Sequence, residues 1–483
     1  MNASLMSLEL CVIALGTVLL LADFWVPAER KKFLAYAAIL ALGGMFVLSF
    51  NGGGFCNPGS AFNGSFVNDA LAVFFKRFFL LAAMLVLFIA AEFSSRISAA
   101  ISEFYSLVLF ALAGMLFAAS ANDFAMLFVS IELITITFYV LVSFQRGKLQ
   151  SLEAGVKYLI LGALSSAFMI FGIALIWGTT GELNIIKLAA VAPQFAESKI
   201  FLLGVLLVLV GLGFKIAMFP FQIWAPDVYQ GAPTPTTAFL AIGSKAAGFT
   251  VLMILALDVF RPLQAVLIPV LSALAVATIL FGNLAALTQS NVKRLMGLSG
   301  VSHAGYLLVG VIAAYREPAA VGAVYFYLLA YLLASFAVFA VMAHVSGAND
   351  ADQDLEHYAN LARERPFLGT VLAIGLGSLA GIPPLAGFMG KLLIFVFAFK
   401  AGLYGLLTVA VIGVVISIYY YFGWIRAAFF PSRPATDSAD PESPRPVITP
   451  AGLPLAVAMV LLAAGSVVLG FYQGPFGAWF LAR

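Results

Sequence analysis

The stretch GLGFKIAMFPFQIWAPDVYQGAPTPTTAFLAIGSKAAGF, residues 211–249, decides the fold. It carries Lys215, Lys245 and four prolines, and the segments around it are apolar enough to be membrane spans. A helix through Pro220 must break, because proline lacks a backbone N–H and clashes with the preceding turn. In hydrocarbon, the freed backbone groups are tolerated only where protein or a water-filled cavity surrounds them. A broken helix beside buried ammonium groups therefore predicts an ion or proton site.

The composition of the whole chain excludes a soluble fold. Of its 483 residues, 63% are hydrophobic and only 10% are charged, and the mean hydropathy is +1.07. These values indicate an all-α, multi-pass membrane protein. Cys11 and Cys56 are too few for a four-thiolate iron–sulfur cluster, and their expected places, mid-span and loop, argue against a disulfide. The net charge of +3, spread over many loops, argues against a nucleic-acid partner.

Hydrophobic runs predict about fourteen transmembrane helices. Their expected ranges are 5–24, 33–50, 70–91, 102–120, 122–144, 153–177, 199–219 with a broken extension to 230, 236–258, 264–288, 295–315, 320–345, 367–400 with an interruption, 402–428 and 450–471. The first span has no basic segment before it, so we expect it to be retained rather than cleaved as a signal peptide. Two hydrophilic connections, 346–366 and 431–449, stand out between later spans, and the second is expected to be irregular and exposed.

The distribution of lysine and arginine predicts the orientation. If the loop at 25–32 is cytoplasmic, the loops on that side hold thirteen basic residues and those on the opposite side hold six. Because basic residues favour the cytoplasmic side, we expect both termini to face outward and both hydrophilic connections to face the cytoplasm.

Six further basic residues fall inside predicted spans, and three of them have ordinary explanations. Lys76 and Arg77 lie in the first third of span three, where snorkelling to an interface would account for them. Lys157 lies one turn into span six, near the inner face, which fits either an interface anchor or a role in proton uptake.

The other three, Lys215, Lys245 and Lys391, lie near the centres of their spans and cannot snorkel easily. Each costs roughly 2.5–3.5 kcal/mol to insert at mid-bilayer. A purely structural role does not account for that cost, so we predict that these lysines carry the function.

Three other polar residues need an interpretation. Glu132 lies midway through span five and either pairs with a buried lysine or stays protonated against a backbone carbonyl. His303 lies at mid-depth of span ten, as a packed hydrogen-bonding side chain or as a relay group. Asp227 directly follows Pro226 and is expected to cap a short helix near the surface.

The second half of the chain repeats this organisation. In GSLAGIPPLAGFMGKLLIF, residues 377–395, Pro383 and Pro384 break span twelve shortly before Lys391. Five spans separate the two broken spans, so equivalent elements would face opposite sides of the membrane. This order predicts two inverted five-helix repeats, spans four to eight and nine to thirteen, each with a broken helix. The expected divisions are 1–100, three N-terminal helices; 101–260, the first repeat; 261–430, the second repeat; and 431–483, the exposed loop and last helix.

Five stretches resemble the subunit N family of the proton-pumping NADH:quinone oxidoreductase, respiratory complex I. They are SIELITITFYVLV (130–142), SLEAGVKYLILGALSSAFMIFG (151–172), FPFQIWAPDVYQGAPTPTTAFLAIGSKAAGF (219–249), NVKRLMGLSGVSHAGYLLVG (291–310) and GIPPLAGFMGKLLIF (381–395). The form PDVYQGAPTPTTAFL is specific, because the antiporter relatives more usually carry a leucine-proline-alanine version of it. Gln222 departs from the histidine that the family commonly has before the tryptophan, which puts a proton role at that position in doubt.

The resemblance implies a membrane subunit that translocates protons, driven by electron transfer in other subunits, and that has no redox site of its own. Glu132 and Lys215 would be the paired charges of the inner half-channel, and Lys245 the central relay lysine. Lys391 would be the lysine of the outer half-channel. Lys157 and His303 are secondary candidates for the relay.

The resemblance also implies partners and a location. NAD, FMN, iron–sulfur clusters and quinone would be bound by partner subunits, and this chain would hold no cofactor or metal. Its neighbours would be other membrane subunits, antiporter-like and small, in the bacterial inner (plasma) membrane.

Three alternatives stay open at this point. A subunit of a multisubunit sodium/proton antiporter would share the fold and the buried charges. A quinone- or haem-binding redox subunit would need paired mid-membrane histidines, and only His303 qualifies. A standalone solute carrier would need a varied polar pocket, whereas the polar residues at depth are chiefly titratable.

Overall fold

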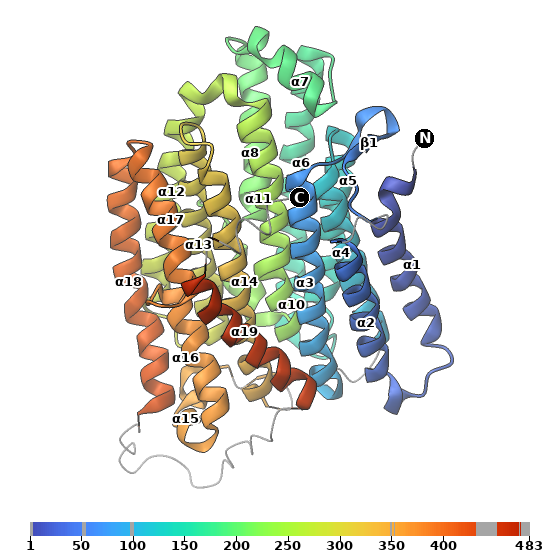
Figure 1. Ribbon diagram of the computed structural model, residues 1–483, viewed down its shortest axis with the longest axis vertical. Coiled ribbons are helices and arrows are strands. Elements are labelled where there is room, and N and C mark those ends of the chain that lie inside the picture. The colour runs from blue at the N-terminus through green and yellow to red at the C-terminus, as the bar shows by residue number, and fades with distance from the viewer. Residues whose placement is uncertain are drawn as a thin grey trace.

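The computed structural model describes residues 3–50, 55–96, 101–347, 350–351, 353–430, 452–472 and 474. It is predominantly helical, and most helices run roughly along the long axis of the molecule (Figure 1). The first half contains α1 (Ser7–Ala22), α2 (Lys32–Leu48), α3 (Ala70–Glu92), α4 (Ile101–Ser120), α5 (Phe124–Val142), α6 (Leu149–Thr180), α7 (Ile185–Val191), α8 (Lys199–Lys215), α9 (Trp224–Gly231), α10 (Thr234–Phe239) and α11 (Lys245–Met253). The second half contains α12 (Gln264–Ala286), α13 (Val292–Ala314), α14 (Ala320–Val345), α15 (Leu361–Glu364), α16 (Pro366–Ala380), α17 (Ala386–Lys400), α18 (Tyr404–Phe429) and α19 (Leu453–Phe471).

Among the described residues, 11 helical segments are long and apolar enough to cross a membrane. All 11 coincide with predicted spans, namely those on α1, α3, α4, α5, α6, α12, α13, α14, α18 and α19 and the segment Thr234–Val259. The other predicted spans contain shorter or interrupted helices, namely α2, α8 with α9, and α16 with α17.

Burial separates central helices from peripheral ones. The apolar windows of α13 and α14 are 100% buried, whereas those of α12 and α18 are 33% buried. The segment Thr234–Val259 is also central, at 89%. The helices that carry Lys245 and His303 therefore lie inside the protein, away from lipid.

Both predicted helix breaks are present. α8 ends at Lys215 and α9 begins at Trp224, with Pro220 between them. α16 ends at Ala380, and α17 begins at Ala386 after Pro383 and Pro384. At the second break Gly381 adopts φ 87°, a left-handed conformation that glycine takes without strain and that commonly ends a helix.

Some elements were not predicted. β1 (Gly59–Ala61) and β2 (Phe66–Asn68) form an antiparallel hairpin in which Gly59 pairs with Asn68. The hairpin lies at the same end of the molecule as α7, and α15 lies at the opposite end (Figure 1). Two π-helical segments, η6 (Leu240–Ser244) and η7 (Ile254–Val259), flank α11 and make Thr234–Val259 one continuous helical span. The connection at 431–449 lies outside the described residues, so the expectation for it stays a prediction.

Candidate functional site

Lys215, Lys245 and Lys391 are all buried, with 6%, 3% and 3% of their surface exposed. Lys215 is the last residue of α8, directly before the first break, and Lys245 opens α11 after the π-helical segment η6. Lys391 lies early in α17, beyond the second break. Each lysine therefore stands next to irregular backbone, where polar groups are available inside the protein.

Each member of the first charged pair has a hydroxyl group as its partner. The Lys215 ammonium donates to Thr135 Oγ1, and Ser166 Oγ donates to Glu132 Oε1 at 2.5 Å. Among the described residues, Glu132 and Lys215 form no direct ion pair, and their role as the paired charges of an inner half-channel stays a prediction. Thr135 lies one helical turn from Glu132 on α5, which places the hydroxyl partner of the lysine beside the carboxylate.

Lys245 is bound to the backbone of α13. Its Nζ donates to the carbonyl oxygen of Gly300 at 2.6 Å and lies 5.6 Å from the centre of the Tyr331 ring. A Cβ at position 300 would stand 2.8 Å from that nitrogen, so only glycine admits the ammonium without displacement. The contact joins the first half of the chain to the second.

His303 lies between two tyrosine hydroxyls. Its Nδ1 is 2.6 Å from Tyr327 Oη and its Nε2 is 3.1 Å from Tyr421 Oη, and the imidazole packs against the Tyr331 ring with centroids 4.8 Å apart. A neutral imidazole donates at one nitrogen and accepts at the other, so both hydroxyls are satisfied. This arrangement is that of a packed hydrogen-bonding histidine, and a relay role for it stays a prediction.

Lys391 stabilises the end of a broken helix. Its Nζ donates to the carbonyl oxygens of Leu379 at 2.7 Å and Ala380 at 3.1 Å, and it lies 5.2 Å from the centre of the Tyr306 ring. The last carbonyls of a helix lack intrahelical partners and carry partial negative charge, so they favour a cation. The break in span twelve thus supplies the acceptors for the buried charge.

Lys157 and Asp227 lie at the surface of the first half. Lys157 is 42% exposed at its side chain and pairs with Glu153 at 2.7 Å and with Asp227 at 2.8 Å. Asp227 also pairs with Arg294 at 2.6 Å. The prediction that Asp227 caps a helix is wrong, because it lies inside the first turn of α9, whose N-cap position is Ile223. Its carboxylate instead joins α6 to α13.

Lys76 and Arg77 are buried in the protein, so the snorkelling interpretation is wrong for both. Lys76 is 0% exposed and pairs with Glu9 of α1 at 2.6 Å. Arg77 donates to the carbonyl oxygen of Ser49 at 2.7 Å and lies over the Phe50 ring. Snorkelling requires a helix that faces lipid at that level, whereas the apolar window of α3 is 83% buried. Glu9 was missed, because one carboxylate near the start of an apolar helix gives no signal of its partner.

Nothing among the described residues forms a group of three or more histidine, cysteine, aspartate or glutamate side chains that could hold a metal ion. Cys11 and Cys56 are free thiols. Gln222 is 2% exposed, and Trp224 nearby donates from Nε1 to the carbonyl oxygen of Phe214 at 3.1 Å.

The transmembrane family described as NADH:quinone oxidoreductase/Mrp antiporter matches residues 121–417, the part of the chain that contains every residue from Glu132 to Lys391. NADH-quinone oxidoreductase subunit N 1 of Opitutus terrae is 53% identical, over 98% of this chain and 96% of that protein. The chain belongs to the subunit N family of NADH:quinone oxidoreductase.

Solved structures agree with membership in the subunit N family. A chain of respiratory complex I from Thermus thermophilus, solved with bound aureothin, has 33% identity and a TM-score of 0.79, over 97% of this chain and 98% of that one. A chain of the Mrp complex from Dietzia has a TM-score of 0.80 over 100% of this chain and 97% of that one, but only 22% identity, so that likeness shows the fold alone. The subunit N interpretation is accordingly favoured over the antiporter alternative.

Proposed function

We propose that this chain translocates protons for NADH:quinone oxidoreductase through a relay that runs from Glu132 and Lys215 to Lys245 and on to Lys391. The observation that carries the proposal is the placement of three lysine ammonium groups, each at most 6% exposed, on hydroxyl and carbonyl acceptors, with Lys215 and Lys391 beside the two helix breaks. Such charges are costly inside a membrane and mark ion and proton paths. Electron transfer in other subunits supplies the energy, and NAD, FMN, iron–sulfur clusters and quinone are bound there.

The contacts suggest how the relay changes state. A change in the charge of Glu132 alters how tightly Lys215 holds its proton, because a nearby carboxylate favours the charged ammonium. A proton released by Lys215 passes to Lys245 at the interface with α13 and then to Lys391. Lys157, half exposed among carboxylates at one end of α6, serves proton uptake, and His303 with its two tyrosines bridges toward Lys391.

The architecture that goes with this relay has fourteen transmembrane spans and two inverted five-helix repeats. Each repeat has one broken span with a buried lysine beside the break, Lys215 in one and Lys391 in the other, which supports the pairing. The proposed divisions, taken from the sequence, are 1–100, 101–260, 261–430 and 431–483. Both termini face away from the cytoplasm of a bacterial cell, and the chain lies in the inner membrane.

Alanine replacement of Lys215 or Glu132 tests the relay. Either change leaves the span-seven site unable to alternate between charged and neutral states, so proton transfer through the site is lost. We expect proton pumping to fall by about 100-fold or more. Lys215→Arg fails as well, because arginine stays protonated at physiological pH. The measurement is proton translocation in inverted membrane vesicles, at complex content matched by native gel.

Lys187→Ala is the matched control for these variants. Lys187 is an exposed lysine on α7 that is not part of the proposed relay, and its removal leaves pumping at the wild-type rate. If Lys215→Ala assembles and pumps like the wild type, Lys215 is structural and the relay assignment is wrong.

A further inference from the structure

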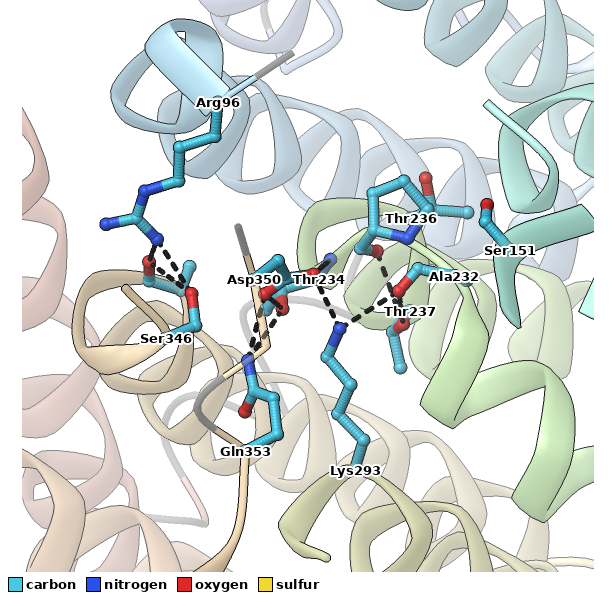
Figure 2. A network of polar contacts seen from close by, with 12 residues as sticks. Arg96, Ser151, Ala232, Thr234, Thr236, Thr237, Lys293, Ser346, Asp350 and Gln353 are labelled. Atoms are coloured by element: carbon cyan, nitrogen blue, oxygen red, sulfur yellow. Dashed lines mark hydrogen bonds and ion pairs between the residues drawn. The ribbon is translucent and has the colours of Figure 1, made fainter. Parts of the chain in front are cut away.

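A buried carboxylate from the second half of the chain caps the helix that carries Lys245. Asp350, in the connection after α14, receives four hydrogen-bond donors (Figure 2). Its Oδ1 accepts from Thr234 Oγ1 at 2.7 Å and from Gln353 Nε2 at 2.9 Å. Its Oδ2 accepts from the Thr234 backbone N–H at 3.1 Å and from Lys293 Nζ at 2.6 Å.

The local sequence explains why the cap must come from elsewhere. The N-cap position of α10 is Pro233, whose side chain cannot accept a hydrogen bond, whereas serine, threonine, aspartate or asparagine would normally do so. The first backbone N–H groups of a helix lack intrahelical partners, and a negative charge placed there is favourable. Asp350 supplies both the acceptor and the charge to the span Thr234–Val259.

Lys293 and Arg294, at the start of α13, bind the α9 side of the junction between α9 and α10. Lys293 Nζ donates to the Ala232 carbonyl oxygen at 3.0 Å, directly before α10. Arg294 Nη1 donates to Asp227 at 2.6 Å and to Gln230 at 2.9 Å, both on α9. The junction between α9 and α10 is therefore attached to α13 on both sides.

The same helix α13 also receives the relay lysine. Gly300, two turns beyond Lys293, offers its carbonyl oxygen to Lys245. The side chains of Lys293 and Asp350 are only 1% and 2% exposed, so their ion pair is enclosed by protein. The four donors that bind the Asp350 carboxylate hold it in one orientation. A buried pair of this kind is a weak source of stability and is better suited to fixing the register of packed elements.

We propose that Lys293 and Asp350 are positioning residues for proton transfer: they fix the start of the Thr234–Val259 span against α13 and so keep the Lys245 ammonium on the Gly300 carbonyl. The proposal rests on the proposed function only in taking Lys245 as a relay group. Neither residue exchanges protons with the relay, and both act through the placement of the helix.

Hydrogen–deuterium exchange on the intact complex tests the placement without reference to pumping. In Asp350→Ala, the amides from Thr234 through Lys245 exchange at least about tenfold faster than in the wild type, because the cap that holds this end is removed. If only the Thr234 amide changes and the amides up to Lys245 keep wild-type protection, Asp350 is a local cap and the proposal is overturned.

Activity variants test whether the placement matters for transfer. Asparagine tolerates the left-handed backbone that Asp350 adopts, at φ 52°, so Asp350→Asn keeps the local fold. Its amide NH2 faces groups that are themselves donors, so two of the four hydrogen bonds lose their acceptor. We expect lower quinone-coupled proton pumping at an unchanged KM for quinone. The double change Lys293→Asp with Asp350→Lys keeps both charges but places an ammonium against the Thr234 N–H, so it does not restore pumping. Restoration by the swap would show that only the ion pair matters and would refute the capping role.

Two further variants distinguish a loss of the Asp350 contacts from a general loss of folding. Thr234→Val removes one hydroxyl donor to Asp350 and produces a smaller change of the same sign in exchange and pumping. Asp354→Ala is the matched control, an exposed aspartate in the same connection that contacts Asn291 at 3.5 Å, and it leaves both readouts at wild-type values. Lys245→Ala separates the two proposals: wild-type pumping in that variant refutes the relay, while its amide exchange still reports whether the Asp350 cap holds the span.

Discussion

Thr135 and Ser166 are the hydroxyl partners of the two charges with which the proposed relay begins. The Lys215 ammonium rests on Thr135 Oγ1, and Glu132 accepts from Ser166, so hydroxyl groups take the places that a direct ion pair would fill. The Thr135 hydroxyl accepts from the lysine and donates to the carbonyl oxygen of Ile131 at 2.6 Å, so its own proton is directed at the backbone of α5. The separation also leaves each charge free to change without breaking an ion pair.

Thr135→Val is expected to impair pumping while preserving the fold. Valine keeps the branched shape of threonine but removes the acceptor, and a hydrogen bond to a charged group contributes roughly 1.5–3 kcal/mol, or about 10- to 100-fold in rate. Proton translocation in vesicles measures the effect. Thr137→Val is the control on the same helix, since the Thr137 hydroxyl donates only to the Leu133 carbonyl oxygen, and equal losses in the two variants would refute a specific role for Thr135.

The buried ion pair between Lys76 and Glu9 is expected to matter for the stability of the fold. Lys76→Ala strands a carboxylate that is 0% exposed, which costs about 3–5 kcal/mol when one partner of a buried pair is removed. Lys76→Met combined with Glu9→Leu removes both charges and recovers most of the loss. The thermal midpoint of the detergent-purified complex reports both effects, and Lys31→Ala, which breaks a partly exposed pair with Asp23, shifts it little. A double variant as unstable as the single one would refute the stranded charge as the cause.

Asp350 makes the stability of the junction between α9, α10 and α13 depend on pH. Burial alone raises the pKa of the Asp350 carboxyl, but the Lys293 ammonium and the hydrogen bonds from Lys293, Thr234 and Gln353 outweigh it and hold the pKa below its usual value. A carboxyl whose pKa is depressed in the folded state contributes stability above its unfolded pKa of about 3.9, and that stability is lost as the pH falls through the folded pKa. The thermal midpoints of wild type and Asp350→Asn should therefore differ near neutral pH and converge in acid. A constant difference down to about pH 2 would contradict this account.

Sequence alone identified the costly residues but not their partners. Lys215, Lys245 and Lys391 were predictable because a charge at mid-span always requires an explanation. Thr135, Tyr327 and Asp350 were not, since hydroxyls and a loop aspartate carry no comparable cost until the packing places them against a charge.

At the scale of the elements, the contact of the Lys245 side chain with the backbone of α13 depends on Gly300. Alanine at this position would place a Cβ 2.8 Å from Lys245 Nζ and 3.3 Å from Tyr331 Oη, although alanine favours the helix itself. We expect Gly300→Ala to lower pumping by about 10- to 100-fold, by displacing a charged hydrogen bond of roughly 1.5–3 kcal/mol, without lowering the thermal midpoint by a comparable amount. Gly405→Ala on α18 is the control, because nothing lies within 4 Å of the added Cβ. Wild-type pumping in Gly300→Ala would show that the contact is dispensable.

Long apolar helices and proline breaks were readable from the sequence, whereas short elements were not. The breaks after Lys215 and before Lys391 follow from prolines that cannot continue a helix. The three-residue strands β1 and β2 and the seven-residue α7 give no periodic signal of their own, and tertiary contacts such as the pairing of Asp123 with Asn184 hold this end together.

At the scale of the whole molecule, charge and burial form one pattern. The helices that carry Lys245 and His303 are, with α14, the most enclosed of the described spans. The ion pairs from Lys157 through Asp227 and Arg294 lie around the end where Asp350 caps the central span. A row of alternating charges thus joins α6, α9 and α13 on one side of the protein. Those contacts link the two halves of the chain at the inner surface of our proposed topology.

Cysteine labelling in intact cells tests that topology. The bias of thirteen basic residues against six places Glu356, an exposed residue in the connection between α14 and α15, in the cytoplasm, and Lys187, exposed on α7, outside. With Cys11 and Cys56 replaced, Lys187→Cys should react with a membrane-impermeant thiol reagent in intact cells, and Glu356→Cys should react only after permeabilisation. The basic-residue bias assigns the two positions to opposite sides of the membrane. Labelling at each position is therefore the control for whether the reagent reaches the other. The reverse pattern would invert the molecule in the membrane, and proton uptake would then begin on the side opposite to the one on which Lys157 and Glu132 are expected to serve it.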